Sequence, residues 1–542
     1  MNVYLAGMLL SILAYICVGL YVGRRIKTVE DYYVSGRNCP TILITGTLFA
    51  SMLSTTGFMG DTAYCYNGNV TTIILLNSLC ASGYVFGALF FGRYIRRAKI
   101  NTMPMYFGLR FNSTRIRRFA GLTTIVSITA YLLAVMQGTG MLMETATGLD
   151  RVSCLFIAWV CFVSFTFYSG SKGVIITDTM QFLLFLFATI IGGPAIFKAA
   201  GGLQNLVVNL AHSPNTPADL LSFHGNVGKG TAFDIVMYAI TMGAIWLLTV
   251  GVSPWQAGRN LMAKNEHVIF RSGAMAAILT VVFLTYLYLM AISVILIYPH
   301  MAEPEKVIIW TAFNVMPTVI GVAVLAGILA AGLAHGSTFL SVIGFSITDV
   351  ILGVEAKGDA AHLRFTRIVV LLVGLVALFL AYLRLSNIRI ISWFASTIIA
   401  SSWGFVAFAS VWSKRLTERG AFYSMVGGFV GYLGSKCLQE FAGWPLKNFF
   451  DPFFIGLAVS VVLGILGSLG QEPTSEEVAY QQKLHVIPES DAVPAEYKRD
   501  RLYGWIMVGS GLAISVLFIW FWALPYNAAI GKEISLFGSL LH

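Results

Sequence analysis

A few ionisable and hydroxyl-bearing residues lie within long apolar stretches, where such side chains are costly unless they serve a function. His335 stands inside one stretch, and Asp61 closely follows Ser54-Thr55-Thr56-Gly57 in another. An ionisable residue at this depth is a candidate functional residue. The pKa of a free imidazole lies near neutrality, so His335 could load and release a proton. Asp61 is a second protonation candidate, with simple hydration in an outer vestibule as the alternative.

Residues 42–69 are long enough to cross a bilayer but form a poor continuous helix. Hydroxyl side chains and glycines at the centre compete with helical hydrogen bonds. A break would expose backbone groups at mid-membrane depth, which is tolerable where they line a cavity or bind a solute. The alternative is a kinked helix whose small residues let neighbours approach. A second interruption, TVGVSP at 249–254, ends the apolar stretch 231–252.

The composition is that of a polytopic membrane protein. Of the 542 residues 57% are hydrophobic and 11% are charged, whereas soluble proteins carry about a quarter charged residues. The net charge of +10 comes from short loops beside apolar stretches, which indicates membrane orientation rather than nucleic-acid binding. The seven cysteines are scattered without metal-binding spacing, so neither a disulfide framework nor a zinc site is expected. The first apolar stretch has no signal-peptide pattern and is expected to be a retained span.

A membrane span needs about 20 apolar residues, and about fourteen such stretches are present. The ninth is too long for one crossing and is expected to begin with a short interfacial piece at residues 310–317. The expected spans are 3–23, 42–69, 71–95, 118–147, 151–169, 174–199, 231–252, 269–297, 311–352, 363–385, 389–412, 421–440, 450–470 and 504–526.

The distribution of Lys and Arg predicts the orientation. The loops after the first, third, seventh and eleventh spans are basic, and the 200–230 loop on the opposite side has only Lys229. Basic loops are cytoplasmic, so both termini are expected outside a bacterial-type plasma membrane. The polar segment 471–503 is expected to be a cytoplasmic linker without a core of its own.

Ten spans divide into two halves, 42–199 and 231–412, and each half opens with an interrupted helix. Five spans per half make the halves antiparallel, and paired interruptions point to a central site between inverted repeats. The remaining units are expected to be 1–41 (an extra helix and cytoplasmic loop), 413–470 (C-terminal helices), the 471–503 linker and 504–542 (the last helix and an external tail).

Three motifs resemble those of the sodium:solute symporter family. They are DYYVSGR at 31–37, YSGSKGV at 168–174 followed by TDTMQ at 177–181, and, in part, ILAA at 328–331 continuing to SITD at 346–349. The resemblance covers roughly residues 5–440. It implies an all-α membrane protein with the leucine-transporter-type fold of 5+5 inverted repeats, working by alternating access. Local strings such as LMETA at 142–146 resemble bacterial pantothenate permeases, although proline and monocarboxylate members share much of them.

The resemblance also implies an ion site, and here the chain departs from the family. Backbone carbonyls of Ala50, Leu53 and Ala331 would hold sodium, and two hydroxyl side chains would complete the shell at positions occupied here by Ala334 and His335. Asp178 matches a family carboxylate near the cytoplasmic exit of that site. Sodium prefers hard oxygen ligands, so an ordinary sodium site is not expected, and a His335–Asp178 pair could place a positive charge there.

Three interpretations of His335 are open. It could be a satisfied interior histidine that locks two helices, a proton carrier, or part of a sodium site with a rearranged shell. Asp178 and Asp61 are the other candidate proton sites. No cofactor is expected apart from sodium or a proton as the coupling ion.

By the same resemblance, the substrate lies between the two broken helices and the third core helix. Amides freed at a half-helix N-terminus would suit a carboxylate, and Trp246 could cover an apolar body. Gln137 and the threonines could equally be interhelical contacts, and the Trp beside Pro254 an interfacial anchor. The candidates are Ser54, Thr55, Thr56, Gly57, Gln137, Thr139, Trp246, Thr249, Ser253, Trp255 and Gln256.

The favoured function is a symporter-type transporter that imports a small organic anion or zwitterion, such as pantothenate or a monocarboxylate, with proton coupling or without sodium. One alternative is a sodium-coupled, proline-like amino-acid symporter. Another is a transporter-like ligand sensor, which the absence of a signalling domain disfavours. An enzyme is not expected, because the sequence has no GxxxxGK[ST] loop and no metal constellation. The expected partners are a small molecule and the lipid bilayer.

Overall fold

The computed structural model describes residues 3–223, 225, 230–348, 359–383 and 388–531. Lys229 and Asp349, which entered the sequence predictions, lie outside these residues. Within them, ten helical segments are long and apolar enough to cross a bilayer, and three shorter apolar helices add Thr41–Ala50, Arg151–Ser164 and Pro452–Ser468. Together with helix α17 (Glu418–Phe441) they overlap the fourteen expected spans, of which 311–352 and 363–385 extend beyond the described residues.

The first half begins with α1 (Val3–Gly23), the short α2 (Val29–Val34) and α3 (Thr41–Ala50). After α3 the chain leaves the helical conformation for four residues and resumes as a π-helix, Thr56–Asp61, and α4 (Thr62–Tyr64). A second π-turn (Cys65–Asn69) then reverses the chain at Gly68, whose φ of 110° is favourable for glycine. The return crossing is α5 (Val70–Gly87), which continues through a π-turn (Ala88–Gly92) into α6 (Arg93–Arg97).

The rest of this half is α7 (Met103–Arg110), α8 (Thr114–Thr147) and the long α9 (Arg151–Ala199). The expected spans 151–169 and 174–199 are joined in α9, which bends at Gly170 (φ 50°). A side chain at Gly170 would lie 2.5 Å from the ring of Tyr32. The Tyr32 hydroxyl donates to the carbonyl of Thr166 at 3.0 Å, and Lys172 pairs with Asp31 at 3.3 Å. The bend therefore holds two of the motifs against each other.

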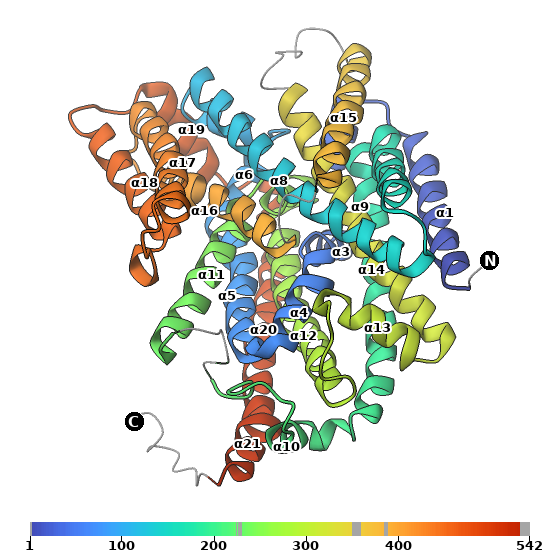
Figure 1. Cartoon of the computed structure of the whole chain (residues 1–542). Helices are drawn as coiled ribbons and strands as arrows, with labels where there is room; N and C mark the ends of the chain where they lie inside the picture. Colours follow the sequence, from blue (N-terminus) through green and yellow to red (C-terminus); the bar gives the residue numbers. More distant parts are fainter. Residues whose placement is uncertain (1–2, 224, 226–229, 349–358, 384–387, 532–542) are drawn as a thin grey trace.

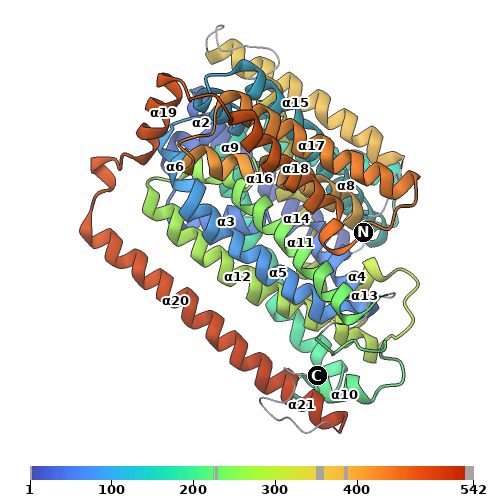
Figure 2. The ribbon, with the colours of Figure 1, turned by 90° about the vertical axis from the view of Figure 1, so that its left-hand side faces the viewer.

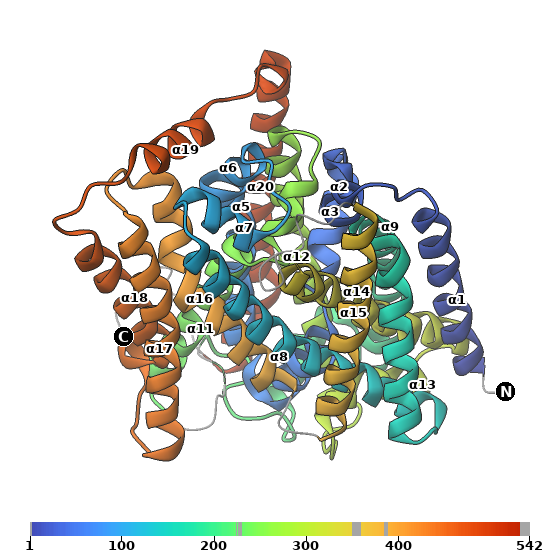
Figure 3. The same ribbon diagram turned by 90° about the horizontal axis from the view of Figure 1, so that it is seen from above.

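The second half follows α10 (Leu206–His212). It consists of α11 (Ala232–Val252), α12 (Glu266–Ser293), α13 (Val307–Asn314), α14 (Thr318–Ser346), α15 (Asp359–Tyr382) and α16 (Ile388–Trp412). Helix α13 is the expected short piece before the ninth span. The two broken helices lie near the centre of the bundle, with α1 at one side and α17 and α18 (Pro452–Ser468) at the other (Figure 1). Figure 3 gives the same arrangement from above.

The basic loops gather on one face, which we call the basic face. Arg37 donates to the carbonyl of Ile100 at 2.6 Å, and Arg96 donates to that of Ala263 at 2.7 Å. Arg97 forms a buried ion pair with Glu266 at 2.5 Å. These contacts join the loops that were predicted to lie together on one side of the membrane.

The polar segment 471–503, expected to be a linker without a core of its own, contains a helix that was not predicted. Residues Ser475–His485 form α19, capped by Thr474 and docked on the basic face. Gln481 donates to the carbonyl of Val411 at 2.8 Å, while Arg97 donates to that of Leu484 at 2.9 Å. The segment has too little apolar surface for a core of its own. It is held instead by hydrogen bonds with arginines and with carbonyl groups at helix ends of the bundle.

The last helix also starts earlier than expected. Helix α20 (Pro494–Phe518) continues through a π-turn (Ile519–Ala523) into α21 (Leu524–Ala529) and runs along one edge of the bundle (Figure 2). Its polar first turns, which hydropathy assigned to the linker, are held by ion pairs from Arg271 to Asp500 (2.7 Å) and Glu496 (2.6 Å).

Candidate functional site

The first break lies at residues 51–54, inside the bundle. Ser51 and Ser54 are both 1% exposed and Thr55 is fully buried. Ser54 starts the next helical segment, because its hydroxyl accepts from the amide of Thr56 at 3.0 Å and its carbonyl accepts from the amide of Gly57 at 3.1 Å. The hydroxyl residues thus cap a new helix instead of continuing the old one, as their preference for caps predicts.

The second break ends α11 at Val252, and a 3₁₀ segment begins at Ala257. Ser253 is fully buried, and its hydroxyl accepts from the amide of Gln256 at 3.3 Å. The Gln256 side chain then reaches the first break, where Nε2 donates to the carbonyl of Ser51 at 2.9 Å and Oε1 accepts from its hydroxyl at 3.4 Å. The two interruptions are therefore hydrogen-bonded to each other at the centre of the protein.

Close packing brings the third helix of each half against the first break. A side chain at Gly138 of α8 would lie 2.5 Å from the Thr55 hydroxyl. One at Gly332 of α14 would lie 3.1 Å from Cγ2 of Thr55 and 2.4 Å from the hydroxyl of Thr139. Gln137 is 5% exposed, and its Nε2 has no hydrogen-bond partner among the residues that the structure describes. Because buried amides are normally paired, Gln137 is well placed to bind a solute.

Aromatic rings line the space between the second break and α14. Tyr131 lies at its centre, with ring centroids 6.1 Å from Trp246, 5.9 Å from Trp255 and 4.7 Å from Phe339. Trp255 is only 1% exposed, so it is a core residue and not an interfacial anchor. Sequence reasoning missed Tyr131 and Phe339, which carry no signal beyond being aromatic residues in apolar spans.

Thr249 differs from the other substrate candidates. Its hydroxyl donates to the carbonyl of Ser396 in α16 at 3.1 Å. The contact joins α11 to α16, so the hydroxyl of Thr249 already has an interhelical partner.

His335 is fully buried and lies beside the main chain of Ser51, which places it against the first break as expected. Its Nδ1 is 3.3 Å from the carbonyl of Ala331, one of the three expected ion ligands. Within the described part of the chain, Nε2 makes no hydrogen bond. The imidazole therefore lies between the carbonyl of Ala331 and the main chain of Ser51.

The donor set here does not fit the expected sodium shell. Ala334 offers no side-chain oxygen, and the hydroxyl of Ser337 donates to the carbonyl of Ala334 at 3.1 Å within its own helix. The hydroxyl of Thr338 accepts from Arg259. Hard cations such as sodium need several oxygen ligands, and the hydroxyls nearest the site in sequence are already engaged.

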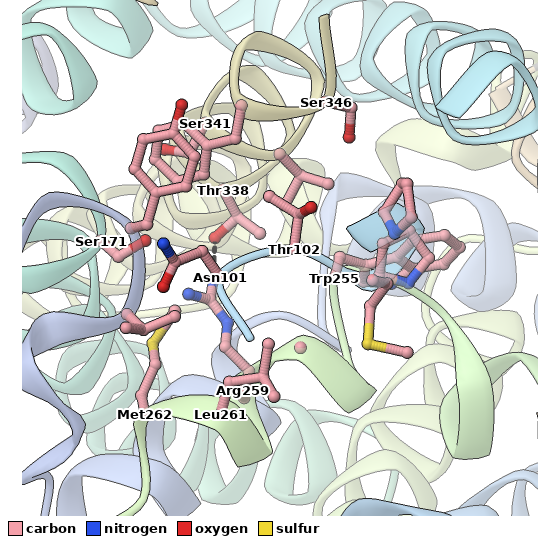
Figure 4. A pocket seen from close by; sticks show the side chains of 18 residues that line it. Asn101, Thr102, Ser171, Trp255, Arg259, Leu261, Met262, Thr338, Ser341 and Ser346 are labelled. Carbon is pink, nitrogen blue, oxygen red and sulfur yellow. Dashed lines mark hydrogen bonds between the residues drawn. The ribbon is translucent and has the colours of Figure 1, made fainter. Parts of the chain in front are cut away.

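Asp178 is paired differently from the prediction. Its Oδ2 accepts from the Thr47 hydroxyl at 2.6 Å and from Arg259 at 3.2 Å, and the acid and the arginine are 0% and 4% exposed. The expected partner was His335, but the carboxylate pairs with Arg259, which follows the second break. In Figure 4 the Arg259 guanidinium points to Thr338, at the edge of a cavity that Trp255 and Ser171 also line.

Asp61 lies at the other end of the first broken helix. Its Oδ1 is 3.4 Å from Nε of Arg389, in the first turn of α16, and its Oδ2 accepts from the hydroxyl of Tyr288 at 3.4 Å. Arg389 was not predicted as a site residue, because an arginine in the first turn of a span is usually interpreted as a charge that flanks the membrane.

These features define a membrane transporter, and the chain belongs to the sodium:solute symporter family, which matches residues 32–428. It is 24% identical over 485 residues to the sodium/proline symporter of Escherichia coli, covering 86% of this chain and 92% of that protein. It is 22% identical to the sodium/pantothenate symporter of Haemophilus influenzae, covering 84% and 93%.

The fold is also that of a solved structure, the substrate-bound outward-open state of a Na⁺-coupled sialic acid symporter. That structure aligns with a TM-score of 0.75 and 19% identity, covering 87% of this chain and 98% of the other. The leucine-transporter-type fold expected from the motifs is confirmed, and so is a transport function.

Proposed function

We propose that this protein imports a small organic anion or zwitterion, such as pantothenate or a monocarboxylate, without a sodium ion in the site that the family motif defines. The observation that carries the proposal is the pair Ala334 and His335, with the imidazole buried against Ser51. The named relatives couple transport to sodium, and this substitution separates the chain from the motif that their family shares.

The proposed substrate pocket lies between the two breaks. Ser54, Thr56 and Gln137 offer polar contacts, and Trp246 and Trp255 with Tyr131 offer apolar walls. This combination of a few polar groups with aromatic walls suits a small amphipathic solute.

His335 is the first candidate for coupling to protons, with Asp178 and Asp61 behind it. An imidazole has a ring nitrogen that can take up and release a proton, which the side chains of alanine and serine cannot do at that position. A carrier whose cation site holds a titratable ring would respond to a proton gradient and not to a sodium gradient.

The test is counterflow in proteoliposomes with labelled pantothenate, pyruvate and L-proline. We expect exchange of one of these solutes to persist when choline replaces sodium and to accelerate under an inward proton gradient. A protonophore should remove the acceleration. Uptake that falls away in choline would contradict sodium independence, and a failure to exchange any solute would argue for the sensor.

Restoring the family hydroxyls sharpens this test. The double variant Ala334→Ser/His335→Thr places two hydroxyls on α14 where the family has them. We expect it to gain sodium stimulation and lose acceleration by the proton gradient. The variant Ala326→Ser, two turns earlier on the same helix, is the matched control and should change neither.

A sodium-coupled amino-acid symporter is the second candidate, because a sodium/proline symporter aligns over 86% of this chain. It requires sodium to bind with a rearranged shell that includes His335. Proline counterflow that stops in choline would favour this function over the first.

A further inference from the structure

A large cavity opens on the face opposite the basic loops, and we call it the vestibule. Its volume is about 650 Å³, whereas the cavity beside Arg259 measures about 40 Å³. Residues of both halves line it, among them Tyr64, Tyr238, Met242, Arg389 and Trp393. A solute of drug-like size fits a space of this volume, so the described conformation is open to solutes on the vestibule side.

Arg389 is held in the vestibule wall by aromatic rings. Its Cζ lies 3.7 Å from the ring centroid of Tyr64 and 4.1 Å from that of Trp393. Cation–π contacts hold the face of a guanidinium, while its N–H groups lie in the plane of the group. Tyr238 is a hydrogen-bond partner of the same guanidinium. A planar guanidinium held in this way is well suited to bind a carboxylate through two parallel hydrogen bonds.

The bond between Arg389 and Asp61 is weak by comparison. The distance between Nε of Arg389 and Oδ1 of Asp61 is 3.4 Å, beyond the usual range of a charged hydrogen bond. Asp61 also has a second donor in Tyr288, which in turn accepts from Asn77 at 2.5 Å. The carboxylate of Asp61 can therefore give up Arg389 and still keep a hydrogen bond.

The vestibule also leads to the first break. Gly60 lies beneath Arg389, and a Cβ at Gly60 would be 3.5 Å from both the Cβ of Arg389 and the Cγ2 of Thr56. A solute bound to Arg389 would therefore already be beside a residue of the substrate pocket.

We propose that Arg389 is the first docking site for the carboxylate of the transported solute, which displaces the carboxylate of Asp61 on entry. The proposal rests on the proposed function and adds a requirement to it, that the solute carries a carboxylate. The guanidinium exchanges one anionic partner for another, so its charge is never left unpaired in the wall of the vestibule.

The experiment compares carboxylates with analogues that lack the charge. Equilibrium binding is measured in nanodiscs for pantothenate, propionate and L-proline, each beside pantothenol, propionamide or L-prolinamide. We expect at least one carboxylate to bind at least tenfold more tightly than its analogue, since a charged hydrogen-bond pair contributes that much. Arg389→Gln should weaken the carboxylate about 10- to 100-fold and leave the analogue unchanged.

A variant of Asp61 distinguishes the proposal from a purely structural pair, because the two predict affinity changes in opposite directions. Asp61→Asn removes the competitor for Arg389, so this variant should bind the carboxylate more tightly than the wild type. If the pair serves only as a structural contact, Asp61→Asn and Arg389→Gln would weaken binding alike, and that result would overturn the proposal. Arg389→Lys keeps the positive charge but loses the two parallel N–H donors of the guanidinium, so it should bind the carboxylate with intermediate affinity. This variant replaces Arg389→Gln in the experiment if the glutamine variant does not fold.

Lys436→Gln is the matched control, because this lysine lines the same vestibule but is paired with Glu440 at 2.6 Å. It should leave carboxylate binding unchanged. Failure of all three carboxylates to bind the wild type would also overturn the docking site. Counterflow of any other solute would then leave the transport function standing, so the two failures are distinguishable.

Discussion

Two aspartate–arginine pairs stand at opposite ends of the central site, and they differ in burial. The basic-face pair, Asp178–Arg259, is sealed in the protein and further bonded to Thr47 and Thr338. The vestibule pair, Asp61–Arg389, has side chains 17% and 13% exposed and borders a cavity of about 650 Å³. Each joins the broken first helix of one half to the fifth helix of the other.

The inverted repeat accounts for this arrangement. Acids come from the first half and arginines from the second, so the two pairs occupy related positions on opposite sides of the membrane. One side is closed by a pair whose acid and arginine are 0% and 4% exposed, whereas the related pair on the other side borders the vestibule. In an alternating-access cycle the two pairs would exchange these roles.

The largest expected effect is on folding stability at the basic-face pair. Arg259→Gln leaves the buried carboxylate of Asp178 without its cation, and such a loss typically costs about 3–5 kcal/mol. Denaturant titration in mixed micelles should show this decrease in the free energy of unfolding. The double variant Arg259→Gln/Asp178→Asn removes both charges and should recover part of it. A single variant as stable as the wild type would contradict the buried-pair description.

The second prediction concerns access to the cavities. In two single variants, cysteine replaces Ala63 in the lining of the vestibule or Ser341 in the lining of the cavity beside Arg259. A charged thiol reagent should modify the cysteine at 63 about tenfold faster. Adding Asp178→Asn/Arg259→Gln should raise the rate at 341 and lower that at 63, because the closed side has lost its ion pair. Equal rates in the parent proteins would remove the asymmetry on which the comparison rests.

Much of this site could be predicted from the sequence, for physical reasons. Ser54, Thr55, Thr56 and Gly57 weaken a helix locally, so a break was predicted there from residue types. The structure has the break at residues 51–54 and resumes the helix with the predicted residues. The same holds for the TVGVSP break. Their joining through Ser51 and Gln256 was out of reach, since a hydrogen bond across 205 positions leaves no local pattern.

Charge partners were the least predictable part. Asp178 was identified as a site residue through the family motif, yet its partner is Arg259 and not His335. An ion pair between two helices depends on how the helices are placed relative to each other. The spacing of residues within one segment does not predict that placement. The docked segment 475–485 was missed for a related reason, because its binding energy comes from arginines elsewhere in the chain.

The third prediction measures the coupling within the vestibule pair. A double-mutant cycle with Arg389→Gln and Asp61→Asn should give about 1–2 kcal/mol for unfolding, between the values typical of exposed and of buried pairs. Partial exposure and the 3.4 Å distance between Nε of Arg389 and Oδ1 of Asp61 limit the coupling energy. A coupling as large as that of Asp178 with Arg259 would mean that the vestibule pair is a second closed contact, and the proposed exchange with a solute would then be unfavourable.

The smallest effect is expected at an ion pair outside both cavities. Arg115 and Glu418 join α8 to α17 on the basic face with side chains 53% and 26% exposed. Solvent screens such a pair, so Arg115→Gln should change the free energy of unfolding by less than about 1 kcal/mol and leave both labelling rates unchanged. The variant removes an arginine–carboxylate contact with no role in the central site. It therefore serves as the reference for the three preceding predictions. If it destabilised the protein as much as Arg259→Gln does, burial could not be the cause of the difference between the two central pairs.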